Sequence, residues 1–306
     1  MDIEAESSSD SQARDAWSGF LSNRLAERIH SPAVGCLPRR PPQRPVWHVW
    51  SDLGCPLVAA HRGLSSRAPE NTLVSLEMGI GAGADLLECD VRLSADGVAV
   101  LHHDVDLRRT TGHPGEVRSL TLGELKQLDP GRWKGVRFAG QTIPTLQEAL
   151  QFIAGRRRLI VEIKEPDMAA SVLSAIRAAA VDPAEVLLFS FHREVLEAIV
   201  ADEPRIPATW LARNLPPGIE AWQCHLAMAT EAGMSAVGLS VATATIPRID
   251  LAHQCALPVF VWTANEGADM RELIEAGVDG MCTDYPGRLL KLLGRSTTAP
   301  VAGTTA

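Results

Sequence analysis

Lysine is scarce in this chain of 306 residues, which contains only Lys126, Lys134, Lys164 and Lys291. Arginine supplies the other basic residues, and acidic residues outnumber basic ones by 37 to 29. The net charge of −8 repels a phosphate backbone, so we expect no nucleic-acid partner. Because lysines are so few, the position of each one is informative.

The sequence also lacks a long apolar run. No stretch approaches the roughly 20 residues that span a bilayer, so we expect no stable membrane insertion. The first residues are acidic and polar, unlike a signal peptide, which makes the cytoplasm the expected location. The six cysteines include no CxxC pair, so we expect reduced thiols rather than a disulfide framework.

Composition divides the chain into three parts. Residues 1–45 begin acidic and serine-rich and end rich in proline and arginine, so they bury too little apolar surface to offset the entropy of ordering. We expect a disordered or loosely docked extension there. Residues 46–295 have the composition of one folded domain, and residues 296–306 form a low-complexity tail that we expect to be flexible.

Short runs of Val, Ile and Leu alternate with helical patterns through the folded part. Eight near-continuous apolar strands alternating with helices predict a single-domain α/β fold, the (β/α)8 TIM barrel. A doubly wound open sheet is the alternative, but no glycine-rich dinucleotide fingerprint follows the first strand. The predicted strands are 57–61, 86–93, 98–102, 159–164, 186–191, 208–211, 236–240 and 259–263, and the predicted helices are 72–83, 121–128, 145–155, 168–181, 193–202, 222–233, 246–255, 266–276 and 287–294.

Two of these strands carry charged residues, at the ends where a barrel builds its active site. Alternation along the second strand places Glu88 and Asp90 on one face and Cys89 on the other. The fourth strand places Glu162 and Lys164 together in the same way. Three carboxylates inside apolar strands require compensating charge, and all-oxygen ligands suit Mg²⁺ or Ca²⁺ better than zinc. We therefore predict a divalent metal site; a structural ion pair is the alternative for Glu162 and Lys164.

Basic residues and histidines accompany the predicted metal site. Arg62 follows the first strand, and Lys164 is the only lysine inside a predicted apolar strand, so both are candidates to hold an anionic group of a substrate. His61 and His103 follow the first and third strands and can transfer protons near neutral pH. A metal, basic residues and two histidines together are typical of phosphoryl chemistry.

The ordered set of motifs resembles the glycerophosphodiester phosphodiesterase family over roughly residues 57–294. Each motif alone is weak evidence, whereas their order and spacing together are specific. The motifs are His61-Arg62-Gly63, Pro69-Glu70-Asn71-Thr72, Glu88-x-Asp90, His103-Asp104, Leu107-x-Arg109-Thr110-Thr111, Ile143-Pro144-Thr145-Leu146, Glu162-x-Lys164, Ser190-Phe191, Trp262-Thr263-x-Asn265 and Gly277-Val278-Asp279-Gly280-x-x-Thr283-Asp284-Tyr285-Pro286.

The resemblance implies a TIM barrel that hydrolyses glycerophosphodiesters, a class of small-molecule substrate, to sn-glycerol 3-phosphate and an alcohol. In the family mechanism the glycerol 2-hydroxyl attacks phosphorus, and water then opens a cyclic phosphate. By match to the family motifs, the site would consist of the metal ligands Glu88, Asp90 and Glu162, the acid/base pair His61 and His103, the phosphate-binding residues Arg62 and Lys164, and the supporting residues Glu70, Asn71 and Trp262.

Two supporting residues have a second interpretation. Asn71 would lie near the metal or cap the helix that begins near Thr72. Trp262 would pack the barrel or form a wall of the substrate site. The sequence departs from the family at His102, where an apolar residue is common, and a slip of one residue would exchange the two neighbouring histidines. We favour His103 because an aspartate follows it.

Two other functions remain as alternatives. A lysophospholipase D or sphingomyelinase-like enzyme would use the same site on lipids and would need an apolar lip, for which the loop with Trp133, Val136 and Phe138 is the candidate. A non-catalytic phosphate-binding barrel would show eroded metal ligands or histidines, which this sequence does not. The sequence leaves the oligomeric state open.

Overall fold

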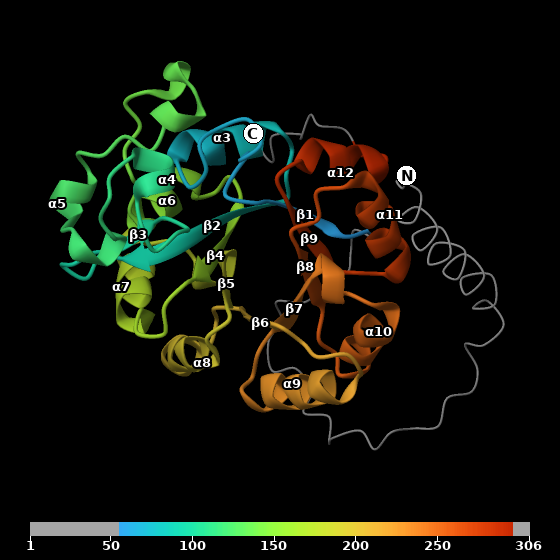
Figure 1. Ribbon diagram of the computed structural model, residues 1–306. Helices are drawn as coiled ribbons and strands as arrows, with labels where there is room; N and C mark the ends of the chain where they lie inside the picture. Colours follow the sequence, from blue (N-terminus) through green and yellow to red (C-terminus); the bar gives the residue numbers. More distant parts are fainter. Residues whose placement is uncertain (1–54, 296–306) are drawn as a thin grey trace, which may run out of the picture. The chain divides into compact units, whose positions relative to one another are not determined.

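The computed structural model describes residues 55–295, so the extension predicted at 1–45 and the tail predicted at 296–306 lie outside it. Eight parallel strands close into the predicted TIM barrel, because β1 pairs with both β2 and β9. Helices surround this barrel (Figure 1). The barrel strands are β1 (Leu57–Ala60), β2 (Leu86–Leu93), β4 (Arg158–Ile163), β5 (Val186–Ser190), β6 (Ala208–Leu211), β7 (Ala236–Ser240), β8 (Val259–Trp262) and β9 (Gly280–Thr283).

One predicted barrel strand is wrong. The segment predicted at 98–102 forms β3 (Ala99–Leu101), which runs antiparallel to β2 in a hairpin outside the barrel. The eighth barrel strand is instead β9, which the strand prediction missed because it is short and begins with glycine. A Cβ at Gly280 would lie 2.3 Å from the ring of Phe260, so glycine leaves room for that ring inside the barrel.

The predicted helices recur in the structure with small shifts of their ends, except that the helix predicted at 121–128 shortens to α5. Among the described residues, no helix is long and apolar enough to cross a membrane. The α-helices are α3 (Leu73–Gly81), α4 (Arg108–Thr111), α5 (Leu122–Leu125), α6 (Leu146–Ile153), α7 (Ala169–Ala179), α8 (Arg193–Asp202), α9 (Glu220–Glu231), α10 (Ile246–Gln254), α11 (Gly267–Ala276) and α12 (Pro286–Leu292), and the 3-10 helices are η2 (Val117–Ser119), η3 (Arg132–Lys134), η4 (Val136–Phe138), η5 (Pro183–Glu185) and η6 (Val241–Thr243).

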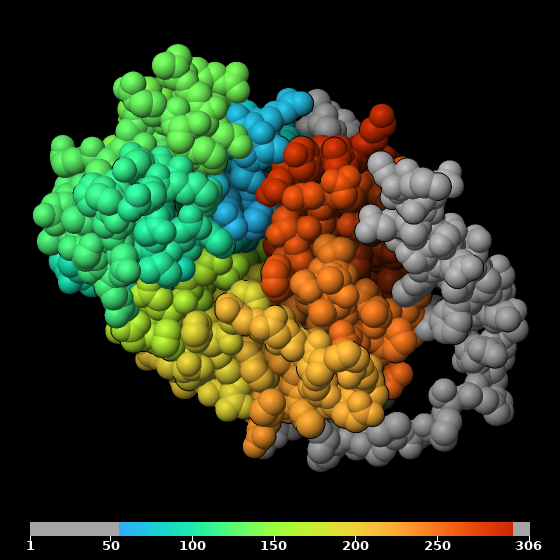
Figure 2. Space-filling view, in the orientation of Figure 1, coloured from blue at the N-terminus to red at the C-terminus, as the bar shows by residue number. Residues whose placement is uncertain are grey.

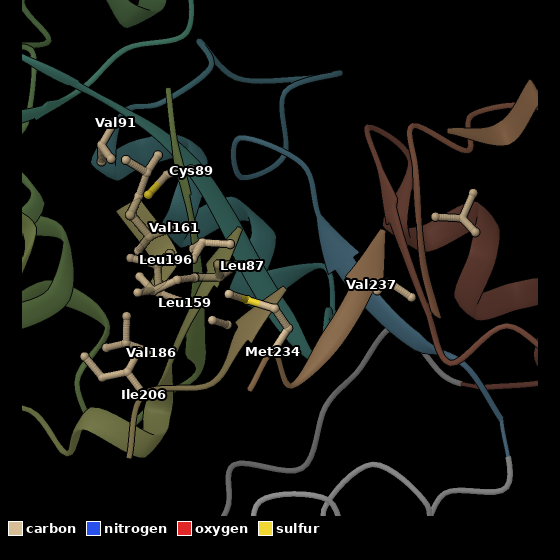
Figure 3. Packing of buried hydrophobic residues seen from close by; sticks show 14 of the residues in the cluster. Leu87, Cys89, Val91, Leu159, Val161, Val186, Leu196, Ile206, Met234 and Val237 are labelled. Atoms are coloured by element: carbon tan, nitrogen blue, oxygen red, sulfur yellow. The ribbon is translucent and has the colours of Figure 1, made fainter. Parts of the chain in front are cut away.

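Alternation along the strands separates two hydrophobic cores. Leu87 and Cys89 of β2 belong to the core between barrel and helices, together with Leu196 of α8 (Figure 3). Leu86 of β2 belongs instead to the smaller core inside the barrel, with Phe260. The carboxylates at positions 88 and 90 share the inner face with Leu86, so they point to the barrel axis while Cys89 does not.

Two aspartates fix the amino ends of the strands. Asp85, just before β2, accepts a hydrogen bond from the backbone N–H of Val58 in β1 (2.9 Å) and pairs with Arg295. Asp279, just before β9, accepts one from the N–H of Val259 in β8 (2.7 Å) and pairs with His253 of α10. Each aspartate therefore links a neighbouring strand and a segment outside the barrel. Both links lie at the floor of the barrel, the end formed by the amino ends of the strands.

Candidate active site

Three carboxylates meet towards the carboxyl ends of β2 and β4. The strand register pairs Asp90 with Glu162. One ligand oxygen from each of these residues and from Glu88 lies within 4.8 Å of the other two. Glu88 and Asp90 are only 2% and 0% exposed. Like charges this close and this deeply buried are unfavourable unless cations accompany them.

Two cations from the protein accompany the three carboxylates. The Nζ of Lys164 lies 2.7 Å from Asp90 Oδ1 and 2.5 Å from Glu162 Oε1, and the Nε of Arg62 lies 3.1 Å from Asp90 Oδ2. The ion pair considered for Glu162 and Lys164 is therefore present, within a larger cluster. Although burial opposes ionisation, these two cations hold the pKa of Asp90 well below its usual range. With all three carboxylates ionised, the two cations leave one negative charge uncompensated.

Glu88 is the least compensated member of this cluster. The backbone N–H of Arg62 donates to its Oε2 (2.7 Å), but its buried Oε1 has no hydrogen-bond partner among the described residues. Burial and the charge of Asp90 raise the pKa of Glu88 to about 8. A buried carboxylate oxygen without a donor can be satisfied by a cation, and a set of carboxylate oxygens fits a hard divalent ion.

The turn after β1 brings Arg62 to the carboxylates. Arg62 and Gly63 both have left-handed backbones, with φ of 54° and 77°. A Cβ at Gly63 would lie 2.4 Å from the carbonyl carbon of Ser75 in α3, so only glycine fits there. The Ser75 hydroxyl donates to the backbone oxygen of Arg62 (2.8 Å), which anchors the turn to the helix.

Asn71 also holds Asp90, at both the side chain and the backbone of the aspartate. Its side-chain amide donates to Asp90 Oδ2 (2.8 Å), and its carbonyl oxygen accepts from the Asp90 N–H (3.0 Å). The N-cap of α3 is Thr72, whose hydroxyl oxygen accepts from the N–H of Ser75 (3.3 Å). The interpretation of Asn71 as a helix cap is therefore wrong, because the cap lies one residue later.

His61 is oriented by an aspartate that follows β9. Its Nδ1 lies 2.7 Å from Asp284 Oδ1, and Asp284 also accepts hydrogen bonds from the Ser65 hydroxyl (2.8 Å) and the Asn265 amide (2.7 Å). Burial opposes the charged ring, but the bond to Asp284 and the nearby charge of Glu88 raise the pKa of His61. With Nδ1 engaged, Nε2 is the nitrogen left for a substrate.

His103 has a similar aspartate partner but a more open environment. Its Nδ1 lies 2.7 Å from Asp104 Oδ1, and Asp104 in turn accepts from the Nε of Arg109 (2.7 Å). Partial burial lowers the pKa of His103. Arg109 also binds Glu70 through two bonds of 2.7 Å, and Glu70 accepts from the guanidinium of Arg62 (2.7 Å). Glu70 thus links the loops that carry the two histidines.

His102 does not share these contacts. It is 4% exposed, and its Nε2 lies 3.1 Å from the backbone oxygen of Asp106. Burial lowers the pKa of His102, consistent with a neutral ring bound to the loop.

Trp262 lies at the end of β8, where its ring packs edge-on against Phe191 with centroids 5.3 Å apart. Its indole Nε1 is buried without a hydrogen-bond partner among the described residues. The sequence interpretation assigned no role to Asp284, Asn265 or Arg109, although the family motifs contain all three. Their partners lie far away in the chain, so only the fold shows what they bind.

A closed barrel with carboxylates, cations and aspartate-bound histidines at the carboxyl ends of its strands is typical of TIM-barrel enzymes. The chain belongs to the glycerophosphoryl diester phosphodiesterase family, whose profile matches residues 61–288. This confirms the resemblance seen in the motifs, and it places the chain among the phosphoric diester hydrolases.

Individual relatives agree with the family profile. The chain is 34% identical over 248 residues to a glycerophosphodiester phosphodiesterase of Caldanaerobacter subterraneus subsp. tengcongensis, covering 78% of this chain and 97% of the relative. It resembles a phosphodiesterase structure from Oleispira antarctica in complex with the product sn-glycerol-3-phosphate, with a TM-score of 0.72, 30% identity and coverage of 79% and 98%. A glycerophosphodiester phosphodiesterase structure from Agrobacterium tumefaciens gives a TM-score of 0.67, 27% identity and coverage of 77% and 99%.

Proposed function

We propose that this protein hydrolyses glycerophosphodiesters to sn-glycerol 3-phosphate and an alcohol, with the help of a divalent cation. The observation that carries the proposal is a buried carboxylate centre accompanied by two histidines, each held by an aspartate. The product bound to the Oleispira antarctica relative supports the choice of substrate class.

Glu88, Asp90 and Glu162 would hold the cation, and oxygen ligands favour Mg²⁺ or Ca²⁺. When bound, the cation would neutralise negative charge on the phosphodiester. Arg62 and Lys164 already lie beside the carboxylates, so they would bind the phosphate oxygens from the protein side. Among the supporting residues, the Asn71 amide fixes the Asp90 carboxylate and Glu70 fixes the guanidinium of Arg62. The ring of Trp262, packed against Phe191 at the end of β8, would support a wall of the substrate site.

His61 and His103 would transfer the protons. Because the pKa of His61 is raised and that of His103 is lowered, His61 holds a proton more readily near neutral pH. We therefore assign His61 to protonate the departing alcohol and His103 to accept a proton from the attacking hydroxyl. The ring of His102 is engaged by the loop backbone and has no part in this scheme.

The histidine assignment predicts large effects of substitution. His61→Ala and His103→Ala should each lower kcat by about 100-fold or more, because a positioned acid or base typically contributes that much. The measurement is release of sn-glycerol 3-phosphate from a panel of glycerophosphodiesters. His113→Ala is the matched control, since the ring of that half-buried histidine accepts a hydrogen bond only from the Gly115 N–H of its own loop. A loss of less than tenfold in His61→Ala would refute its role.

The metal assignment predicts that a chelator abolishes turnover and that Mg²⁺ or Ca²⁺ restores it. Glu88→Gln should weaken cation binding, because it replaces a carboxylate ligand with a neutral amide of the same shape. Calorimetric titration of the apo protein with each metal measures this without turnover. Full activity after exhaustive chelation would contradict the proposal. Faster turnover of lysophosphatidylcholine than of glycerophosphocholine would favour the lipid-directed alternative.

A further inference from the structure

Exposed apolar side chains concentrate near the candidate active site. The described residues include five large hydrophobic side chains that are exposed: Val105, Trp133, Val136, Met228 and Tyr285. Val105 follows the His103-Asp104 pair, and Tyr285 follows Asp284. Trp133 and Val136 belong to η3 and η4, and Val136 is the most exposed of the five at 82%. Met228 of α9 is the one member with no such neighbour.

Contacts attach the η3–η4 segment to the site. The guanidinium of Arg109, which binds Glu70 and Asp104, lies 5.7 Å from the ring centroid of Trp133. The Nζ of Lys134 donates to the backbone oxygen of Ser65 (2.6 Å), and the Ser65 hydroxyl binds the aspartate that orients His61. The exposed side chains of this segment therefore lie at the rim of the barrel mouth.

Positive charge surrounds the same side chains. Residues 61–69 and 130–144 contain no Asp or Glu, although the whole chain has a net charge of −8. Lys134 and Arg137 donate to backbone oxygens, of Ser65 and Arg67 respectively. Within the described part of the chain, neither of them nor the exposed Arg67 forms an ion pair with a carboxylate. These charges remain available to an external anion.

The segment also projects from the body of the molecule. In Figures 1 and 2 the green lobe around residues 130–140 stands out beside the blue segment that follows β1. A protruding tip with an exposed valine and tryptophan between cations differs from a flat apolar face that would bury a protein partner. It is the arrangement expected for contact with a charged lipid interface.

We infer that the basic–apolar lip, formed by Arg67, Trp133, Lys134, Val136 and Arg137, docks on the surface of an anionic lipid bilayer. Val136 and Trp133 enter the headgroup region, while the three cations lie against lipid phosphates. The lip lies beside the barrel mouth, so docking places the site close to the lipid surface. A glycerophosphodiester is what remains of a phospholipid after removal of its acyl chains, so a docked enzyme would lie near the source of its substrate. Only this connection between docking and substrate depends on the proposed function.

The test uses the full chain and measures sedimentation with vesicles of phosphatidylglycerol or of phosphatidylcholine. We expect binding to the anionic vesicles at low salt, weaker binding at high salt, and little binding to phosphatidylcholine. Arg137→Glu should lower the association constant by about tenfold or more, because the lost arginine alone accounts for about fivefold and the new carboxylate is repelled by the anionic surface. Val136→Asp should lower it to a similar extent by removing the apolar contact.

Met228→Asp is the matched control, since it places the same charge on an exposed apolar position of α9 and should leave vesicle binding unchanged. Val136→Asp should unfold in urea at the same midpoint as the wild type, which shows that the variant is folded. No binding to phosphatidylglycerol at low salt, or equal binding by Val136→Asp and the wild type, would overturn the inference. Either result is independent of whether the protein hydrolyses the proposed substrate.

Discussion

At the scale of single residues, Asp284 is the common partner of the polar side chains around His61. It accepts hydrogen bonds from Ser65 and Asn265 while it contacts the histidine ring. These contacts make it a positioning residue, because it acts on the reaction through the tautomer and the charge of the imidazole. The distance in sequence between His61 and Asp284, 223 residues, explains why no local pattern indicates this role.

Asp284→Asn should lower kcat by about 10- to 100-fold, as losses of such orienting partners do. It should also lower the pKa of His61, because the carboxylate that stabilises the charged ring is removed. If His61 donates a proton, the basic limb of the pH–rate profile then moves to lower pH. Ser65→Ala is the control, since it removes a donor to Asp284 but leaves the His61 contact. A lower kcat with an unmoved basic limb would indicate a merely structural role.

The predictable part of the site is the part determined by local alternation. The inward direction of Glu88, Asp90 and Glu162 follows from the period of two residues along a strand. The role of Asn71 does not follow, because its left-handed backbone (φ 56°) and its two bonds to Asp90 depend on a loop packed against another strand. The local sequence suggested that Asn71 caps a helix, whereas in the structure its side chain binds Asp90 of another element.

At the scale of elements, the turn between β1 and α3 depends on one glycine. Gly63→Ala should lower the free energy of unfolding by about 2–4 kcal/mol, because it combines an unfavourable φ with a severe clash. Gly97→Ala is the matched control: Gly97 has a similar φ of 80° but nothing within 4 Å of a Cβ, so about 1 kcal/mol is expected. Urea unfolding measures both. Equal losses would show that the contact with Ser75 is unimportant.

The strand predicted at 98–102 was wrongly assigned to the barrel, because the sequence pattern predicts a strand but not which strands it pairs with. Apolar alternation is the same in an antiparallel hairpin and in a parallel barrel strand, so the pattern of 98–102 cannot distinguish them. What separates them is the connection: a short turn at Gly97 joins β2 to β3, whereas a parallel crossover requires a dozen or more residues. The longer helices were easier to predict, since each extends over two or more turns of one consistent period. The four-residue helices were not: α4 was missed, and α5 was predicted too long.

At the scale of the whole molecule, a buried histidine makes stability depend on pH. His225 of α9 stacks on Trp210, with centroids 3.8 Å apart, and on Trp222, and burial lowers its pKa to about 4. Between that value and the ordinary 6.5, the unfolded chain binds a proton that the folded chain does not. Stability therefore falls as pH falls from 6.5 to 4, by up to about 3 kcal/mol from this group.

His225→Phe should remove this contribution while it keeps an aromatic ring against Trp210. The slope of unfolding free energy against pH between 4 and 6.5 should become smaller by up to about 1.4 kcal/mol per pH unit. Urea unfolding followed at several pH values measures this slope. A slope as steep as that of the wild type would show that His225 does not titrate as the burial implies.

The aspartates at the floor of the barrel have a consequence for how this enzyme could change. Asp85 and Asp279 hold neighbouring strands together at the amino ends, far from the loops that carry the site. These two contacts do not involve the residues that occupy the mouth. We expect exchange of the η3–η4 segment to alter which surfaces the barrel mouth can approach while it leaves these strand contacts in place. Because the strand contacts at the amino ends are separate from the loops at the mouth, substitutions in those loops can change specificity, in the laboratory or by natural selection, while these contacts remain.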